Sequence, residues 1–181
     1  FAVVEGIVLY RPCNLLVGCR YENTYECNNG TKTNGAAIPR ETCIEMNSNM
    51  KLLDEKFGDS DEFGIVSITI DPDNDNPSTL KEYSEALDVK SQNWHFLTGE
   101  KDVIYNLANN GFNIFASVNP KVAGGFEHQG YFALIDKNGF IRSRSDQFGN
   151  PIVYYMGLDE INVEIQEVDM LMEDIDKLLK E

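Results

Sequence analysis

The chain has 181 residues, enough for one globular domain whose core is stable without disulfide bonds. Its 30 acidic and 15 basic residues give a net charge of −15, a surface that repels nucleic acid and anionic lipid. Its longest apolar runs are far shorter than the roughly 20 residues that span a bilayer, so we expect membrane contact only through an anchor upstream of residue 1.

The first two thirds of the sequence alternate strand and helix patterns. Apolar and β-branched runs predict three strands: 3–10, 63–70 and 93–99. Helical periodicity predicts three helices, from about residue 40 to 57, over 77–87 and over 100–111. Strands that alternate with helices imply crossover connections, and therefore a mostly parallel sheet.

Two of these helices have a predicted inward face. In the first, apolar residues recur at helical spacing on one side: Met46, Met50, Leu53 and Phe57. Gly58 is expected to end this helix. In the third helix, Val103, Ile104 and Leu107 are expected to face inward.

The pattern changes in the last third. Residues 130–146 contain two strand patterns around DKNG, a turn sequence typical of a hairpin. Residues 147–163 are a predicted second insertion, in which PIVYYMG has the character of a short strand, and 164–180 a C-terminal helix. We therefore expect a single thioredoxin-like α/β domain over residues 1–181, with a central mixed sheet flanked by helices and a cysteine-containing loop insertion over 14–42.

The four cysteines all lie in the first quarter of the chain: Cys13, Cys19, Cys27 and Cys43. Their clustering in a Gly- and Asn-rich stretch favours disulfide bonds formed in an oxidising compartment. Four cysteines allow three pairings, and the sequence does not choose among them. A zinc site is the competing interpretation, but no C-x2-C pair and no neighbouring His supply its usual spacing.

Cys43 lies in the first turn of the helix expected from residue 40. Unpaired N–H groups and the helix dipole favour a thiolate there, which makes the sulfur a better nucleophile and a better ligand for a soft metal. The alternative is a half-cystine bonded to Cys13, Cys19 or Cys27, or a small buried side chain. Cys43 is thus a candidate redox thiol.

The chain has two histidines. His128 follows a pair of glycines and precedes a strong strand, a position that suits a metal ligand or a proton shuttle. A hydrogen-bonded surface histidine is the alternative. His95 alternates with Trp94 and Phe96, so it is expected to face solvent.

The acidic stretch DPDNDNPSTLKE, residues 71–82, imitates a calcium loop, with acidic residues at positions 1, 3, 5 and 12. A strand precedes it, Asn76 replaces the usual glycine, and Pro77 opens a new helix. We therefore expect a solvated turn in which Asn76 caps the helix that follows.

Four stretches of the sequence carry a resemblance: CIEMNSNM, VSITIDPDNDNPSTLKEYSE, WHFLTGEKDVIYNLA and GGFEHQGYFALIDKNGFIRSRSD. Together they resemble the Sco/SenC family, thioredoxin-fold proteins that deliver copper to cytochrome c oxidase, over residues 43–146 and again in the C-terminal helix. The resemblance implies copper held by two thiolates of a C-x3-C motif and by one His. It makes Cys43 the second cysteine and His128 the histidine ligand, and gives Asp71 a structural or partner-docking role.

The sequence departs from this pattern at the first cysteine, because Pro39 stands four residues before Cys43. Cys13, directly after the first predicted strand, stands where the family has its first motif cysteine. Residues 14–42 would then be an insertion that splits the motif, and Cys13 or another loop cysteine would supply the second sulfur, as metal ligand or as redox partner.

The resemblance implies copper binding or thiol exchange in cytochrome c oxidase assembly. The partner would be the copper-site subunit of the oxidase or a thiol-disulfide partner protein, and the role that of a metallochaperone more than of an enzyme. Two alternatives stay open: a thiol-disulfide oxidoreductase without metal delivery, and a non-catalytic binding module with structural disulfides. The expected location is outside the cytoplasm, in the periplasm or at the outer face of the cytoplasmic membrane.

Overall fold

A six-stranded mixed sheet forms the centre of the fold in the computed structural model, which describes residues 4–9, 40–121, 126–128 and 130–181. Its strands are β1 (Val4–Leu9), β2 (Phe63–Ile68), β3 (Trp94–Leu97), β6 (Tyr131–Ile135), β7 (Ile141–Arg142) and β8 (Tyr155–Met156). The strands β3, β2 and β1 are parallel neighbours, and β6 lies antiparallel beside β1. Both β7 and β8 pair with β6. The predicted mixed sheet is therefore confirmed.

The remaining elements are four helices, a π-helical segment and a small second sheet. The helices are α1 (Arg40–Phe57), α2 (Pro77–Ala86), α3 (Lys101–Asn106) and α4 (Glu167–Leu178), and the π-helical segment η1 (Leu107–Gly111) continues α3. Strands β4 (Ala116–Val118) and β5 (Phe126–His128) form the second, antiparallel sheet. No helix in the described part of the chain has the length and hydrophobicity of a membrane span.

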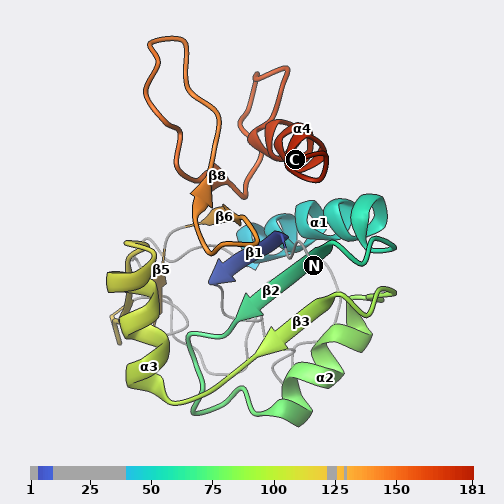
Figure 1. Cartoon of the computed structure of the whole chain (residues 1–181). Helices are drawn as coiled ribbons and strands as arrows, with labels where there is room; N and C mark the ends of the chain where they lie inside the picture. Colours follow the sequence, from blue (N-terminus) through green and yellow to red (C-terminus); the bar gives the residue numbers. More distant parts are fainter. Residues whose placement is uncertain (1–3, 10–39, 122–125, 129) are drawn as a thin grey trace.

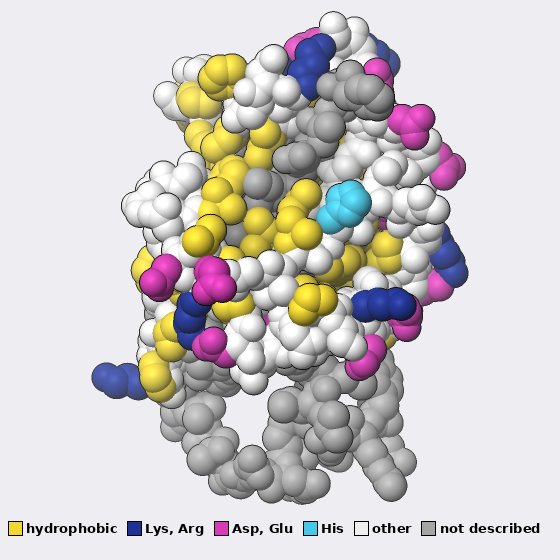
Figure 2. Space-filling view, turned by 60° about the horizontal axis from the view of Figure 1, so that its bottom comes forward, with side chains coloured by type: hydrophobic (Ala, Val, Ile, Leu, Met, Phe, Trp, Pro, Cys, Tyr) yellow, Lys and Arg dark blue, Asp and Glu magenta, His cyan; other side chains and the backbone are white. Residues whose placement is uncertain are grey.

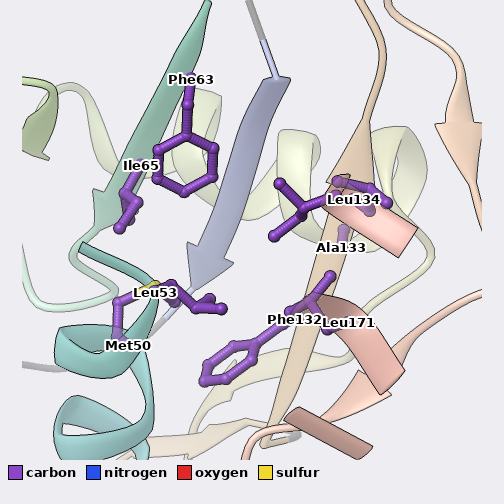
Figure 3. Close-up of a pocket in the computed structure, with 9 residues that line it drawn as sticks. Met50, Leu53, Phe63, Ile65, Phe132, Ala133, Leu134 and Leu171 are labelled. Carbon is purple, nitrogen blue, oxygen red and sulfur yellow. The ribbon is translucent and has the colours of Figure 1, made fainter. Parts of the chain in front are cut away.

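The larger apolar core lies between the sheet and the helices α1 and α4, which Figure 1 shows together above the strands. The four residues predicted for the inner face of α1, from Met46 to Phe57, are all buried, which confirms that periodicity. They pack against side chains from the sheet and from α4: Phe63, Ile65, Trp94, Phe132, Leu134, Tyr155, Val168, Leu171 and Ile175. A gap of about 10 Å³, no larger than a water molecule, lies in this packing where α1, β2, β6 and α4 meet (Figure 3).

The smaller core lies around α3 and η1, and it corrects one prediction. Ile104 is buried as expected, whereas Val103 is 65% exposed. Ile104 and Ala108, four residues apart, define the buried stripe. Val103 lies about 100° around the helix from Ile104, on the solvent side of that stripe.

Two local signals in the sequence set helix boundaries as predicted. Helix α1 ends at Phe57, and a Cβ atom on Gly58 would clash with the carbonyl oxygen of Asp54, so only glycine fits there. Asn76 caps α2, since its side-chain oxygen accepts hydrogen bonds from the backbone N–H groups of Ser78 and Thr79.

Candidate metal and thiol site

Several chain segments with candidate residues meet at one edge of the main sheet. Because β1 and β2 are parallel, their carboxyl ends lie together, and Asp71 follows β2 at that edge. Strand β6 runs the opposite way and begins there, with Phe132 opposite Val8 of β1. His128 ends β5 three residues before β6. In open α/β sheets this edge, outside the carboxyl ends of the strands, is where ligands bind.

Met46 connects the beginning of α1 to this edge. It is 2% exposed, and its sulfur lies 3.5 Å from the position that a Cβ atom on Gly130 would occupy. Cys43 precedes Met46 by one helical turn, on neighbouring positions of the same helix face. Gly130 follows His128 by two residues. The first turns of α1 therefore lie beside the segment that carries His128.

The structure describes the candidate residues unequally. Cys43 is the fourth residue of α1, which confirms its predicted place in a first helical turn, although its side chain is outside what the structure describes. Cys13, Cys19, Cys27 and Pro39 all lie outside the described residues, as does the predicted insertion 14–42 except for its last three residues, which begin α1. His128 is half-buried, and His95 is exposed on β3 as expected.

Asn109 holds the strand that pairs with His128. Its side-chain amide donates to the carbonyl oxygen of Ala116 (2.9 Å), and its side-chain oxygen accepts from the N–H of the same residue (3.2 Å). A further bond reaches the carbonyl oxygen of Tyr105 (2.9 Å). Ala116 is the partner of His128 in the β4–β5 ladder. Asn109 therefore fixes both backbone groups of the residue opposite His128.

Sequence reasoning missed Asn109. In the stretch NLANNG it has the composition of a turn, and nothing local distinguishes it from the asparagines beside it. The distinguishing feature is η1, which widens the helix at this point and turns the side chain toward β4. Such π-helical insertions are frequent at functional sites.

The acidic loop after β2 is the predicted solvated turn only in part: Asp73, Asn74 and Asn76 are exposed, but two carboxylates are buried. Asp71 is 1% exposed and Asp75 is 0% exposed. Thr69 links them, since its hydroxyl donates to Asp75 and accepts from the N–H of Asp71 (2.9 Å). Asn74 donates to both carboxylate oxygens of Asp71 (3.0 and 3.1 Å). The prediction was wrong for these two residues because polar side chains bind oxygens of both carboxylates within the loop.

The described residues contain no group of three or more His, Cys, Asp and Glu side chains that could hold a metal ion. Three of the four cysteines and the Cys43 side chain are outside that search. The donors predicted from sequence are one or two thiolates and one imidazole, a set of soft ligands that suits copper better than calcium or magnesium.

The surface near the second sheet is partly apolar. Figure 2 shows one face of the molecule on which hydrophobic side chains gather, with acidic and basic side chains mainly toward the outline. Around β4, Phe115 and Val118 are half exposed. Apolar side chains on β4 and directly before it therefore reach the surface.

A family model described as SCO1/SenC matches residues 33–161 of the chain. The SCO1 protein homolog of Bacillus subtilis (strain 168), a curated relative, is 29% identical over 99 residues, which are 54% of this chain. The matched part is 51% of that relative, so the chain spans about half the length of the curated protein it matches.

Solved structures share the fold. A SCO1/SenC family lipoprotein from Bacillus anthracis str. Ames has a TM-score of 0.61 at 21% identity, covering 98% of this chain and 81% of its own. Arabidopsis thaliana ScoI with copper bound has a TM-score of 0.54 at 14% identity, with 99% and 84% covered. BsSco, described as a Sco family cytochrome c oxidase assembly protein with a disulfide switch, has 0.54 at 19%, with 98% and 79% covered. The predicted thioredoxin-like α/β fold is confirmed.

Proposed function

Because this chain belongs to the SCO1/SenC family, we propose that it binds Cu(I) through Cys43, His128 and one further cysteine, and that it serves cytochrome c oxidase assembly. One observation of the structure carries the proposal. Met46, one turn after Cys43, packs beside Gly130, two residues after His128. The two residues that the family resemblance selects thus belong to neighbouring segments at one sheet edge.

The chemistry of the donors supports a copper site. The first turn of α1 favours the thiolate form of Cys43, because unpaired N–H groups and the helix dipole stabilise negative charge there. Two thiolates and one imidazole form a trigonal set that suits Cu(I), whereas one thiolate and one imidazole would bind it more weakly. Since Pro39 has no side-chain donor, the second sulfur comes from Cys13, Cys19 or Cys27. Cys13 is our first choice.

Copper is the cargo of this reaction, and the chain holds it until an acceptor takes it. We propose the copper-site subunit of cytochrome c oxidase as that acceptor, outside the cytoplasm. A structural relative that is a lipoprotein supports a membrane-anchored protein there. Clustered cysteines also suit an oxidising compartment. We propose that the same cysteines also exchange disulfides with a partner protein, which the disulfide switch described for BsSco supports.

The proposal is tested by native mass spectrometry of the purified chain, which counts free thiols and bound copper together after mild reduction and addition of Cu(I). We expect one copper per chain, lost in C43S and in H128A. H95A is the matched control, because His95 is exposed on β3, which β2 and β1 separate from β6 and the segment that carries His128, and it should keep its copper. Single serine variants of Cys13, Cys19 and Cys27 then identify the second sulfur.

Two results would contradict the proposal. Tight stoichiometric copper binding that survives in C43S would remove the thiolate from the site. Two disulfides that resist mild reductant, with no copper bound, would identify a binding module with structural disulfides.

A further inference from the structure

Two loops extend from the side of the main sheet where β7 and β8 pair with β6. Arg142 of β7 pairs with Leu134, and Tyr155 of β8 pairs with Phe132, so β7 and β8 follow one another along the free edge of β6. Residues 143–154, the first loop, leave this edge and return to it. Residues 157–166, the second loop, connect β8 to α4. Figure 1 shows both loops projecting beyond the sheet and α4 on one side of the molecule.

The first loop is held rigid around one carboxylate. Asp146 accepts hydrogen bonds from the backbone N–H groups of Phe148 and Asn150, each at 2.8 Å, and these bonds lower its pKa. The N–H of Asp146 donates in turn to the carbonyl oxygen of Asn150 (2.8 Å). Gly149, with φ of +87°, completes a turn that few other residues could form. The turn presents Phe148 at its tip.

The second loop is closed by Gln166. Its side-chain oxygen accepts from the N–H of Glu160 (2.7 Å), and its side-chain nitrogen donates to the carbonyl oxygens of Glu160 (3.1 Å) and Val163 (2.9 Å). At the base of the loop, Asn49 of α1 donates to Asp159 (3.0 Å). The loop is thus fixed at its base and across its width.

Both loops expose large apolar side chains at their tips. Phe148 is 80% exposed and Ile161 is 90% exposed, and Val163 and Ile165 follow Ile161 at alternate positions. These side chains contribute little to the core, yet the backbone beneath them is held by many hydrogen bonds. Rigid presentation of exposed apolar groups lowers the entropic cost of binding and is typical of the anchors of protein interfaces.

The charge of the loops restricts what can bind them. Between residues 143 and 166 the sequence has four acidic residues and one basic residue, Arg144, whose charge is paired with Glu173 and Asp174 of α4. The four are exposed: Asp146, Asp159, Glu160 and Glu164. An anionic membrane or a second copy of this chain, with its net charge of −15, would be repelled. A protein surface with apolar pockets inside a basic rim is complementary.

The bases of the loops lie beside the candidate site. The N–H of Gly157 donates to the carbonyl oxygen of Gly130 (2.8 Å), and Tyr154 stacks on Tyr131 with 5.8 Å between ring centroids. Gly130 and Tyr131 follow His128 by two and three residues in the chain. A protein that binds the loops is therefore held close to the sheet edge that carries His128 and the first turn of α1.

We infer that residues 143–154 and 157–166 form a docking surface for the protein that accepts copper, and that its complementary surface is basic with apolar pockets for Phe148 and Ile161. This inference rests on the proposed function for the identity of the acceptor. The inference adds the part of the chain that recognises the acceptor.

The experiment measures binding of the copper-loaded chain to the purified copper-site domain of the oxidase subunit by isothermal titration calorimetry. We expect F148S and I161S each to weaken binding about tenfold, and added salt to weaken the wild-type complex. F140S is the matched control, because Phe140 is 67% exposed in the turn at the opposite end of β6, and it should bind as the wild type does.

Equal affinity in F148S, I161S and the wild type would overturn the inference, as would failure of the wild type to bind the domain. Copper binding by the chain alone is measured separately, so loss of docking and loss of the proposed copper site give different results. Two further controls test whether a membrane or a second copy of the chain binds the loops instead. Partition onto phosphatidylcholine vesicles that both variants abolish would assign the loops to a membrane surface. Self-association that both variants abolish would assign them to a second copy.

Discussion

Replacing Asp174 with Asn tests whether one buried carboxylate fastens the first loop and β8 to α4. Asp174 is 9% exposed and accepts hydrogen bonds from Tyr155 Oη (2.7 Å), Arg144 Nε (2.7 Å) and Lys177 Nζ (2.9 Å). Arg144 belongs to the first loop and Tyr155 to β8. Asparagine keeps the size of the side chain but removes the charge that Arg144 and Lys177 neutralise.

The pKa of Asp174 gives the size of the effect. Burial opposes ionisation of this carboxylate, but the hydrogen bonds from Arg144, Lys177 and Tyr155 outweigh it and lower the pKa from 3.8 to about 2. The difference, 3.8 − 2, corresponds to roughly 2.4 kcal/mol at about 1.36 kcal/mol per pKa unit, and solvent screening reduces it to about 2 kcal/mol. We expect D174N to lower the free energy of unfolding at pH 7 by about that amount.

The same linkage sets the pH dependence. Because the pKa of Asp174 is lower in the folded chain than in the unfolded chain, its stabilisation is present above pH 3.8 and is lost as the pH falls through about 2. At pH 3 about half of the stabilisation remains. The difference between wild type and D174N should therefore shrink in acid.

Urea unfolding followed by circular dichroism measures both quantities. D176N is the matched control on the same helix, because Asp176 pairs with Lys56 (2.9 Å) across an exposed surface and should contribute less than about 0.5 kcal/mol. Equal losses in D174N and D176N at pH 7, or a difference that does not change between pH 7 and pH 3, would refute the reasoning.

Three further substitutions test other contacts. N109A should lower the free energy of unfolding by about 2 kcal/mol and speed hydrogen exchange of the Ala116 amide; unchanged exchange would contradict the hydrogen bonds between Asn109 and the Ala116 backbone. G157A should cost about 1–3 kcal/mol in thermal unfolding, because the added Cβ would lie 2.9 Å from the ring of Phe132; an unchanged melting temperature would argue against this packing. N76A should cost about 1 kcal/mol in urea unfolding while N76D keeps most of the stability, and equal losses would argue against the cap.

Periodicity and local turn chemistry predicted most of the described fold. The apolar stripe of α1, the cap at Asn76 and the hairpin around residues 136–139 each depend on neighbours within a few residues, and the structure confirms them. The prediction for Val103 was wrong because a short helix has two possible apolar faces, and only the packing of Ala108 shows which face is buried.

The polar contacts between segments could not be predicted in this way. The burial of Asp71 and Asp75 depends on Thr69, and the role of Asn109 depends on β4, so neither has a signature within its own stretch. For the candidate site, sequence placed Cys43 in a first helical turn and His128 before a strand, and the structure agrees with both positions. Their joint role as ligands stays a prediction.

The way the chain leaves β7 and returns at β8 has a consequence for how this protein can diversify. Since Arg142 and Tyr155 both pair with β6 in fixed register, the residues between them can change in number without shifting any strand of the sheet. Doubling the length of such a connection costs only about 0.6 kcal/mol in closure entropy. Recognition can therefore evolve on this excursion while the register around His128 is inherited unchanged.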